Sequence, residues 1–155
     1  MRGPSVSPGY WNKPKETQAA YHDGWLRTGD MAKRDEAGFH ILADRLKDMF
    51  ISGGENVYPA EIEGVLAGHP AVAEVAVIGV PDPRWGEVGV AYVVLRPGER
   101  VGEDVLKDLC AKTLAAYKRP AHVVYLDAIP RNAAGKPQKH VLRETWSKTP
   151  AVART

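Results

Sequence analysis

The chain has 155 residues, enough for one domain with a small additional segment. Hydrophobic residues make up 44% and charged residues 26%, a composition typical of folded globular proteins rather than of disordered chains. The 21 Lys and Arg nearly balance the 19 Asp and Glu, and the resulting net charge of +2 argues against a dedicated nucleic-acid-binding protein.

Cysteine and histidine usage argues against a metal site. Cys110 is the only cysteine, so neither an intramolecular disulfide nor a cysteine-based zinc site can form. The 5 histidines are scattered, with no pair at metal-ligand spacing on a helix. We therefore predict no metal ligands in this chain.

No membrane span or signal peptide is predicted either. The most apolar stretch, 72–80, is interrupted by Glu74 and is too short to cross a bilayer. Residues 1–9 lack the hydrophobic segment of a signal peptide. A cytoplasmic location follows as the prediction.

The first segment, 1–30, is punctuated by Pro and Gly and predicts loops with few core residues. It ends in the turn Thr28-Gly29-Asp30. The Asp30 carboxylate can accept hydrogen bonds from two vicinal hydroxyls, as a ribose offers them. The alternative is that Thr-Gly-Asp is simply a favourable turn.

From residue 31 onward, short elements follow one another closely. The runs 39–42 and 48–51 are strand-like, and Ser52-Gly53-Gly54 is a turn signal. A helix opens at Pro59 and stops before Pro70, with Ile62 and Leu66 on one face.

The remaining pattern predicts the rest of one small domain. Its elements are strands at 75–77 and 88–95, a helix through 105–114, a strand at 122–126, a loop at 130–137 and a terminal helix. The fold class is therefore α+β, with helices on a small, mostly antiparallel sheet that includes an N-terminal β-hairpin.

Three features of the segment 44–63 have chemical potential. Arg45 supplies a rigid fork of donors for ribose or phosphate oxygens. Lys47 lies in a charged stretch between the loose and the compact segments, where a hinge is expected. Gly53-Gly54 allows close approach of the backbone to a ligand, although the pattern lacks the Gly-Lys-Ser/Thr ending of a Walker loop. The alternative is an exposed hairpin with a Gly-Gly turn.

The loop 130–136 carries a single lysine, Lys136, between flexible flanks. Its ammonium could enter another domain's pocket and stabilise negative charge at a phosphate, or it could be an ordinary solvated lysine. Four further basic residues lie nearby in sequence and suggest a basic patch for an anionic cofactor: Lys118, Arg119, Arg131 and Lys139. Few aromatic residues are interleaved with these charges, which disfavours nucleic acid.

Taken together, five motifs in this order resemble the adenylate-forming superfamily, which includes acyl-CoA synthetases, peptide-synthetase adenylation domains and firefly luciferase. The motifs are Gly-Tyr-Trp-Asn (9–12), Gly-Trp-Leu-Arg-Thr-Gly-Asp (24–30), Asp-Arg-Leu-Lys-Asp (44–48), Ser-Gly-Gly-Glu-Asn-Val-Tyr-Pro-Ala-Glu-Ile-Glu (52–63) and Pro-Arg-Asn-Ala-Ala-Gly-Lys (130–136). The motif that begins at Ser52 looks most like those of bacterial fatty-acyl, aryl and feruloyl-type CoA ligases.

This resemblance implies roles for the adenylation step. Asp30 and Arg45 would contact the ribose of ATP or of the acyl-adenylate. Lys47 would be the hinge about which a C-terminal lid domain rotates between two half-reactions. Lys136 would be catalytic, stabilising the α-phosphate as pyrophosphate leaves.

The resemblance also implies a CoA site, used after the rotation. The loop with Ser52, Gly53, Gly54 and Glu55 would line the pantetheine tunnel, and Trp85 and Arg119 would contact the CoA nucleotide. For Trp85 the alternative is a partly buried loop aromatic.

The sequence lacks two family motifs: the phosphate loop ending Pro-Lys-Gly, and the Thr-Glu motif near Mg²⁺ and the adenine. The resemblance therefore implies that ATP phosphates, Mg²⁺ and the acid are held by a large N-terminal domain, in cis or in trans. Residues 1–44 would be the end of that domain, with strands lacking partners. The lid would be 45–148, followed by a disordered tail at 149–155.

The predicted function is the C-terminal part of an AMP-forming acid–CoA ligase, with ATP, CoA and a carboxylic acid, a fatty acid by preference, as substrates. Alone, the chain is expected to be inactive. Two alternatives remain open: a stand-alone CoA-binding or complementing module of a split enzyme, and an adenylation-domain lid that acts on a carrier protein.

Overall fold

The computed structural model describes residues 1–149, except for the side chain of Ala43. The predicted disordered tail lies outside the described residues apart from Thr149. The chain divides into two compact units, and the division falls directly after Lys47. We call residues 1–47 the hairpin unit and the residues from Asp48 onward the lid unit. The functional boundary predicted after residue 44 stays a prediction.

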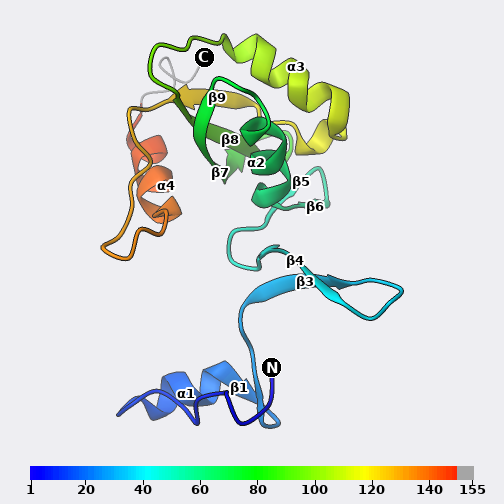
Figure 1. The fold of residues 1–155 in the computed structure, drawn as a ribbon, viewed down its shortest axis with the longest axis vertical. Helices are drawn as coiled ribbons and strands as arrows, with labels where there is room; N and C mark the ends of the chain where they lie inside the picture. The colour runs from blue at the N-terminus through cyan, green and yellow to red at the C-terminus, as the bar shows by residue number, and fades with distance from the viewer. Residues whose placement is uncertain (150–155) are drawn as a thin grey trace. The chain divides into compact units, whose positions relative to one another are not determined.

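The hairpin unit contains one short helix and two antiparallel pairs of strands (Figure 1). Its elements are α1 (Pro14–Ala20), β1 (Tyr21–His22), β2 (Trp25–Leu26), β3 (Asp30–Arg34) and β4 (His40–Arg45). The turn between β1 and β2 has positive φ at both Asp23 and Gly24, as a type I′ hairpin requires. The expectation that strands before Arg45 lack partners is corrected, since turn residues let each strand pair with its neighbour in sequence.

The lid unit contains the remaining elements: β5 (Phe50–Ser52), β6 (Glu55–Val57), α2 (Pro59–Ala67), β7 (Val72–Asp82), β8 (Gly86–Leu95), α3 (Glu103–Thr113), the 3₁₀ turn η1 (Ala116–Lys118), β9 (His122–Tyr125) and α4 (Lys139–Lys148). β8 pairs antiparallel with β7 and β5 and parallel with β9, so the five-stranded sheet is mostly antiparallel. The predicted α+β class and element order are confirmed.

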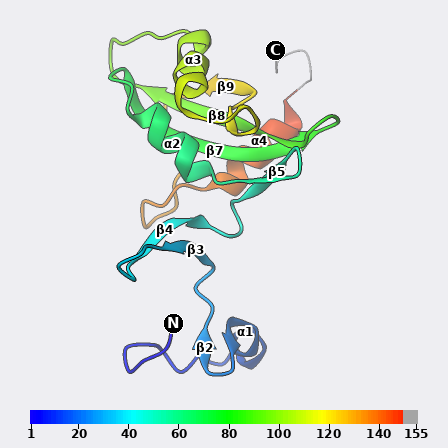
Figure 2. The same ribbon diagram turned by 90° about the vertical axis from the view of Figure 1, so that its right-hand side faces the viewer.

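Both faces of this sheet are covered by helices (Figures 1 and 2). Because strand side chains alternate between faces, Val77 of β7 packs with Ile62 of α2 and Leu106 of α3. The next residue, Ile78, packs on the other face with Leu142 of α4. This arrangement explains why β7 and β8 are long, continuous apolar runs rather than alternating ones.

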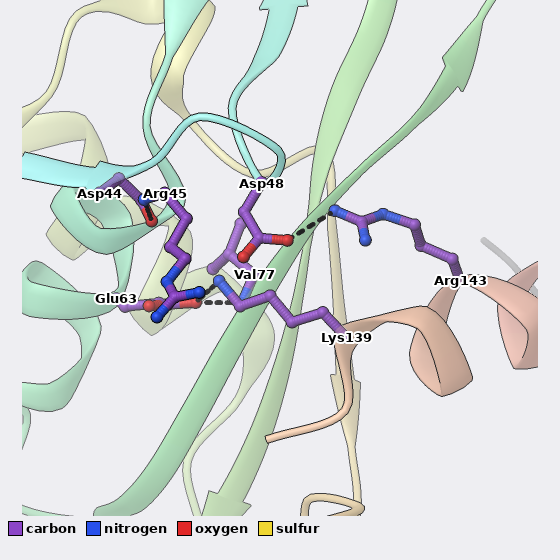
Figure 3. Close-up of polar contacts among 7 residues, drawn as sticks. All are labelled: Asp44, Arg45, Asp48, Glu63, Val77, Lys139 and Arg143. Carbon is purple, nitrogen blue, oxygen red and sulfur yellow. Dashed lines mark hydrogen bonds and ion pairs between the residues drawn. The ribbon is translucent and has the colours of Figure 1, made fainter. Parts of the chain in front are cut away.

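Helix α4 is attached to the lid unit by two ion pairs on one of its sides (Figure 3). Lys139 Nζ lies 2.7 Å from Glu63 Oε1 of α2, and the same oxygen accepts a 2.8 Å hydrogen bond from the Val77 backbone N–H. One helical turn later, Arg143 Nη2 lies 3.3 Å from Asp48 Oδ1. The loop 130–137, which precedes α4, is therefore followed by a firmly anchored helix.

Candidate functional site

The predicted ribose-binding residues lie side by side in the hairpin unit. Asp30 of β3 is the direct cross-strand partner of Arg45 of β4. The Arg45 Nε atom lies 3.3 Å from Asp30 Oδ1, and Thr28 Oγ1 accepts a 3.2 Å hydrogen bond from the Asp30 backbone N–H. Both side chains line a surface pocket together with Leu42 and Asp44.

The pair of Asp30 and Arg45 is suited to binding the hydroxyl groups of a ligand. The guanidinium of Arg45 holds one carboxylate oxygen of Asp30, which leaves Oδ2 to accept hydrogen bonds from a ligand. The two strands therefore present an oriented carboxylate and a cation at one point. Lys47 is exposed and directly precedes the division between the units, while its hinge role stays a prediction.

The predicted pantetheine loop is a tight turn between β5 and β6. Ser52 and Glu55 are paired across it, and Gly53 and Gly54 both have positive φ, at 59° and 87°. Glycine reaches this backbone region without the steric cost that other residues meet. Gly54 is open to solvent, since nothing lies within 4 Å of the position a Cβ would take there.

Trp85 lies directly against this turn. The turn was predicted to line the pantetheine tunnel and Trp85 to contact the CoA nucleotide, and both roles stay predictions. A Cβ added to Gly53 would be 2.9 Å from Trp85 Cε3, and the Gly53 N–H donates to the Trp85 carbonyl at 2.8 Å. Asp82 Oδ1 accepts hydrogen bonds from the backbone N–H groups of Arg84 and Trp85, both at 2.8 Å. The indole stays 41% exposed, so it forms an accessible aromatic surface beside the Gly-Gly turn.

Glu87 also supports this turn and was not predicted from sequence. Its Oε2 accepts a 3.0 Å hydrogen bond from the Ile51 backbone N–H, and Ser52 pairs with Gly86. The short strand β5 is thereby fixed to the beginning of β8. No local sequence signal indicated this contact, because it joins residues 36 positions apart.

Arg119 is occupied by the protein itself. Its Nε donates to the Leu114 carbonyl at 3.1 Å and its Nη2 to the Ala111 carbonyl at 3.2 Å. These bonds satisfy carbonyls at the C-terminal end of α3, where cations also interact favourably with the helix dipole. The predicted contact of Arg119 with a CoA nucleotide stays a prediction.

Lys136 is an exposed residue of a closely bonded loop. The Asn132 side-chain oxygen accepts hydrogen bonds from the backbone N–H groups of Lys136, at 2.9 Å, and of Ala134, at 3.0 Å. The Asn132 N–H donates in turn to the Lys136 carbonyl at 3.0 Å, and Gly135 has a φ of 75°. The backbone of the candidate catalytic lysine is therefore well defined although its side chain is exposed.

The hypothesis of a shared basic patch is not supported. Lys118 is bonded to Glu61, Arg131 to Glu74 and Lys139 to Glu63, and Arg119 contacts backbone carbonyls instead. Three of the four charges are thus paired with carboxylates: Lys118 and Lys139 with two glutamates of α2, and Arg131 with one of β7. Proximity in sequence did not indicate these partners.

The two candidate sites of the lid unit lie at opposite ends of β7. Arg131 of the Lys136 loop is bonded to Glu74 near the start of this strand, whereas Asp82 at its end holds Trp85. Eight residues at about 3.3 Å each separate these positions by roughly 26 Å. The loop and the β5–β6 turn accordingly lie on different sides of the lid unit in both Figures 1 and 2.

Neither a metal site nor a membrane span is found in the part of the chain that the structure describes. Within residues 1–149, no cluster of three or more His, Cys, Asp or Glu could hold a metal ion. The helices of this region are too short or too polar to cross a membrane. Cys110 is buried against α2 and the sheet, and burial raises the pKa of its thiol.

Comparison with known proteins agrees with this geometry. Residues 61–136 match the model of the AMP-binding enzyme C-terminal domain. The chain contains an AMP-binding enzyme C-terminal domain. It is 54% identical over 140 residues to the long-chain-fatty-acid–CoA ligase FadD13 of Mycobacterium tuberculosis, an alignment that covers 90% of this chain and 28% of that ligase.

Two solved structures share the fold of this chain. The o-succinylbenzoate CoA synthetase MenE of Bacillus subtilis, in complex with the acyl-adenylate OSB-AMP, has a TM-score of 0.86 and 44% identity. The ATP-bound RpMatB–BxBclM chimera B1 has a TM-score of 0.86 and 43% identity. The alignments cover 96% and 95% of this chain, but only 30% of each of those structures.

These matches confirm the family resemblance and the lid fold. The chain spans less than a third of the length of the curated relatives it matches. These matches alone therefore do not assign the activity of a complete ligase to this chain.

Proposed function

We propose that this chain is the C-terminal catalytic lid of an AMP-forming acid–CoA ligase. The ligase would activate a carboxylic acid with ATP and transfer the acyl group to CoA. The observation that carries this proposal is the placement of two different candidate sites, the Lys136 loop and the Gly53–Trp85 turn, at opposite ends of β7.

In the first step, a carboxylate oxygen of the acid attacks the α-phosphorus of ATP and the bond to pyrophosphate breaks. The Lys136 ammonium stabilises the negative charge on the α-phosphate oxygens. Asp30 and Arg45 hold the ribose, and their cross-strand ion pair supports this role because it orients the Asp30 carboxylate.

In the second step, the CoA sulfur attacks the acyl carbon and AMP leaves with the electrons of the broken mixed-anhydride bond. The turn at Gly53-Gly54 and the indole of Trp85 line the path of the pantetheine arm. The positive φ of both glycines and the exposed ring support this role, since backbone and aromatic surface can approach the ligand closely.

Because the Lys136 loop is bonded near the start of β7 and the Gly53–Trp85 turn lies at its end, we infer that the two candidate sites serve the reaction centre one after the other. The lid unit must then turn between the two steps, and Lys47 is the proposed hinge. Its position at the division between the two compact units supports this assignment.

The remaining machinery is proposed to come from a large N-terminal domain, in cis or in trans. That domain would hold the ATP phosphates, Mg²⁺ and the acid, so the 155 residues alone would release no pyrophosphate. CoA is favoured as the acyl acceptor because FadD13 and MenE are both named as CoA ligases or synthetases, and a fatty acid is favoured by FadD13.

The test is pyrophosphate release from acid and ATP, using this chain mixed with a separately expressed N-terminal portion of FadD13. Activity should appear only on mixing, and Lys136→Ala should lower the adenylation rate about 10²–10³-fold. Lys112→Ala, at an exposed lysine of α3, is the matched control and should leave the rate unchanged. Thioester formation from supplied acyl-AMP should survive both substitutions.

Either of two results would refute the proposal: full adenylation with the Lys136 variant, or release well above blank by the chain alone. A CoA-binding measurement distinguishes the two remaining hypotheses, a CoA ligase and a lid that serves a carrier protein. Binding of CoA by the isolated chain, weakened by Trp85→Ala, would favour a CoA ligase over a lid that serves a carrier protein.

A further inference from the structure

The side chain of Arg131 bonds the loop that carries Lys136 to the sheet. Its Nη1 donates to the Gly135 carbonyl at 2.6 Å, and its Nη2 lies 2.7 Å from Glu74 Oε2 of β7. One planar guanidinium therefore contacts both the residue before Lys136 and the edge strand β7. Because the guanidinium is planar and rigid, the position of the loop is coupled to the position of β7.

The same loop is closed internally by Asn132 and by backbone bonds at its base. The bridge between Arg131 and Pro137, and the 2.8 Å bond from the Gln138 N–H to the Pro130 carbonyl, tie the two ends together. These bonds fix the shape of the loop. The guanidinium of Arg131 adds a further contact, since it bonds the loop at Gly135 to Glu74 of the sheet.

We propose that Arg131, held by Glu74, is a positioning residue that presents Lys136 for the adenylation step. This inference rests on the proposed role of Lys136. Arg131 does not touch the reacting groups. It sets the direction from which the Lys136 ammonium approaches the α-phosphate, and a displacement of about 1 Å at such a group can cost about 100-fold in rate.

The pair is poorly suited to a purely structural role. The side chains of Arg131 and Glu74 are 43% and 42% exposed, and ion pairs with this exposure contribute little to stability. A positioning role therefore predicts an unusual combination: a large loss of adenylation with almost no loss of stability.

The experiment uses the same mixture of this chain with the N-terminal portion of FadD13, and it measures the two half-reactions separately. Arg131→Ala should lower kcat for adenylation about 10- to 100-fold, with thioester formation from supplied acyl-AMP unchanged. The melting temperature of the chain should shift by less than about 4 °C. Arg131→Lys should recover only part of the rate, since an ammonium lacks the fork that reaches both partners.

Arg96→Ala is the matched control. Arg96 is an exposed arginine that donates from Nε to the Pro70 carbonyl at 3.0 Å, outside the Lys136 loop. Its substitution should leave both half-reactions unchanged. An Arg131→Ala variant that adenylates normally, or that loses both half-reactions equally, would overturn the positioning role.

A second measurement on the chain alone keeps the inference testable if the mixture is inactive. Hydrogen exchange of the Lys136 and Ala134 backbone amides should become at least about 10-fold faster in Arg131→Ala, because the Gly135 carbonyl between these amides loses its bond to the Arg131 guanidinium and the loop opens more often. Unchanged exchange would overturn the inference. The proposed function is tested separately by Lys136→Ala, and it fails if that substitution leaves adenylation unchanged.

Discussion

The two units of this chain differ in what holds them together. None of the described side chains of residues 1–47 is buried, and Trp11 and Leu42 are 95% and 72% exposed. The lid unit contains two apolar clusters, one on each face of its sheet. Local turns and cross-strand bonds therefore define the hairpin unit, whereas burial of apolar surface stabilises the lid unit.

This difference teaches that functional geometry and stability have separate sources here. Asp30 and Arg45 are oriented by strand register in a unit with no core of its own. Lys136 and Trp85 are oriented by loops attached to a packed sheet. Substitutions in the two units should therefore have different consequences for folding.

The largest expected effect is on the core of the lid unit. Leu66→Ala removes a fully buried side chain between α2 and the sheet and should lower the free energy of unfolding by about 2–5 kcal/mol. Leu42→Ala, in the exposed hairpin, should change it by less than about 0.5 kcal/mol. Urea unfolding followed by circular dichroism measures both, and similar losses would contradict the contrast between the units.

The next effect concerns the anchor of α4. Glu63→Ala removes the partner of Lys139 and the acceptor of the Val77 N–H in a partly buried place, at an expected cost of about 2–3 kcal/mol. Glu103→Ala, which breaks an exposed pair with Lys107 one turn away on α3, is the control and should cost less than about 0.5 kcal/mol. Equal costs in urea unfolding would show that the Glu63 contacts are not buried in solution.

A smaller effect separates the two glycines of the β5–β6 turn. Both have positive φ, so alanine at either position should cost about 1 kcal/mol. At Gly53, but not at Gly54, the new methyl group would also collide with the Trp85 ring. Gly53→Ala should therefore be the more destabilising substitution in thermal unfolding, and Trp85→Ala should remove the difference. Equal costs in the presence of Trp85 would argue against the ring packing on Gly53.

The smallest effect is a pH dependence. The hydrogen bond to Glu61 raises the pKa of the Lys118 ammonium above its ordinary value of 10.5. The pair therefore contributes its full stability below about pH 10.5, and the contribution disappears as pH rises through the raised pKa. Lys118→Met should be less stable than the natural chain at pH 8, by less than about 1 kcal/mol. The difference should shrink as the pH rises through the raised pKa, and a difference that does not change with pH would contradict an ionic origin.

Much of this molecule was readable from local patterns. The β5–β6 turn followed from Ser52-Gly53-Gly54, α2 from its initial Pro59 and apolar spacing, and the loop 130–137 from its Pro and Gly content. The Asn132 turn within that loop was not predicted, although Asn before a Gly-containing stretch is a recognisable signal. The candidate roles of Asp30, Arg45 and Lys136 came from motif resemblance and stay predictions.

The contacts between distant residues could not be read in this way. The pairs Arg131–Glu74 and Lys118–Glu61 each join positions 57 residues apart, and the same charges had suggested a basic patch when only their sequence proximity was considered. Charge partners depend on which strand edge and which helix face come together. Only the packed sheet decides that.

The sequence by itself determined the elements of the lid unit and the family motifs, because turns, helix boundaries and apolar periodicity are local properties of the chain. The tertiary structure decided which groups share a site. Pairing of β5 with β8 brought Gly53 to Trp85, and the length of β7 placed Lys136 at the other end of the sheet. Such distances arise from long-range strand pairing and burial, and these act between residues that are far apart in sequence.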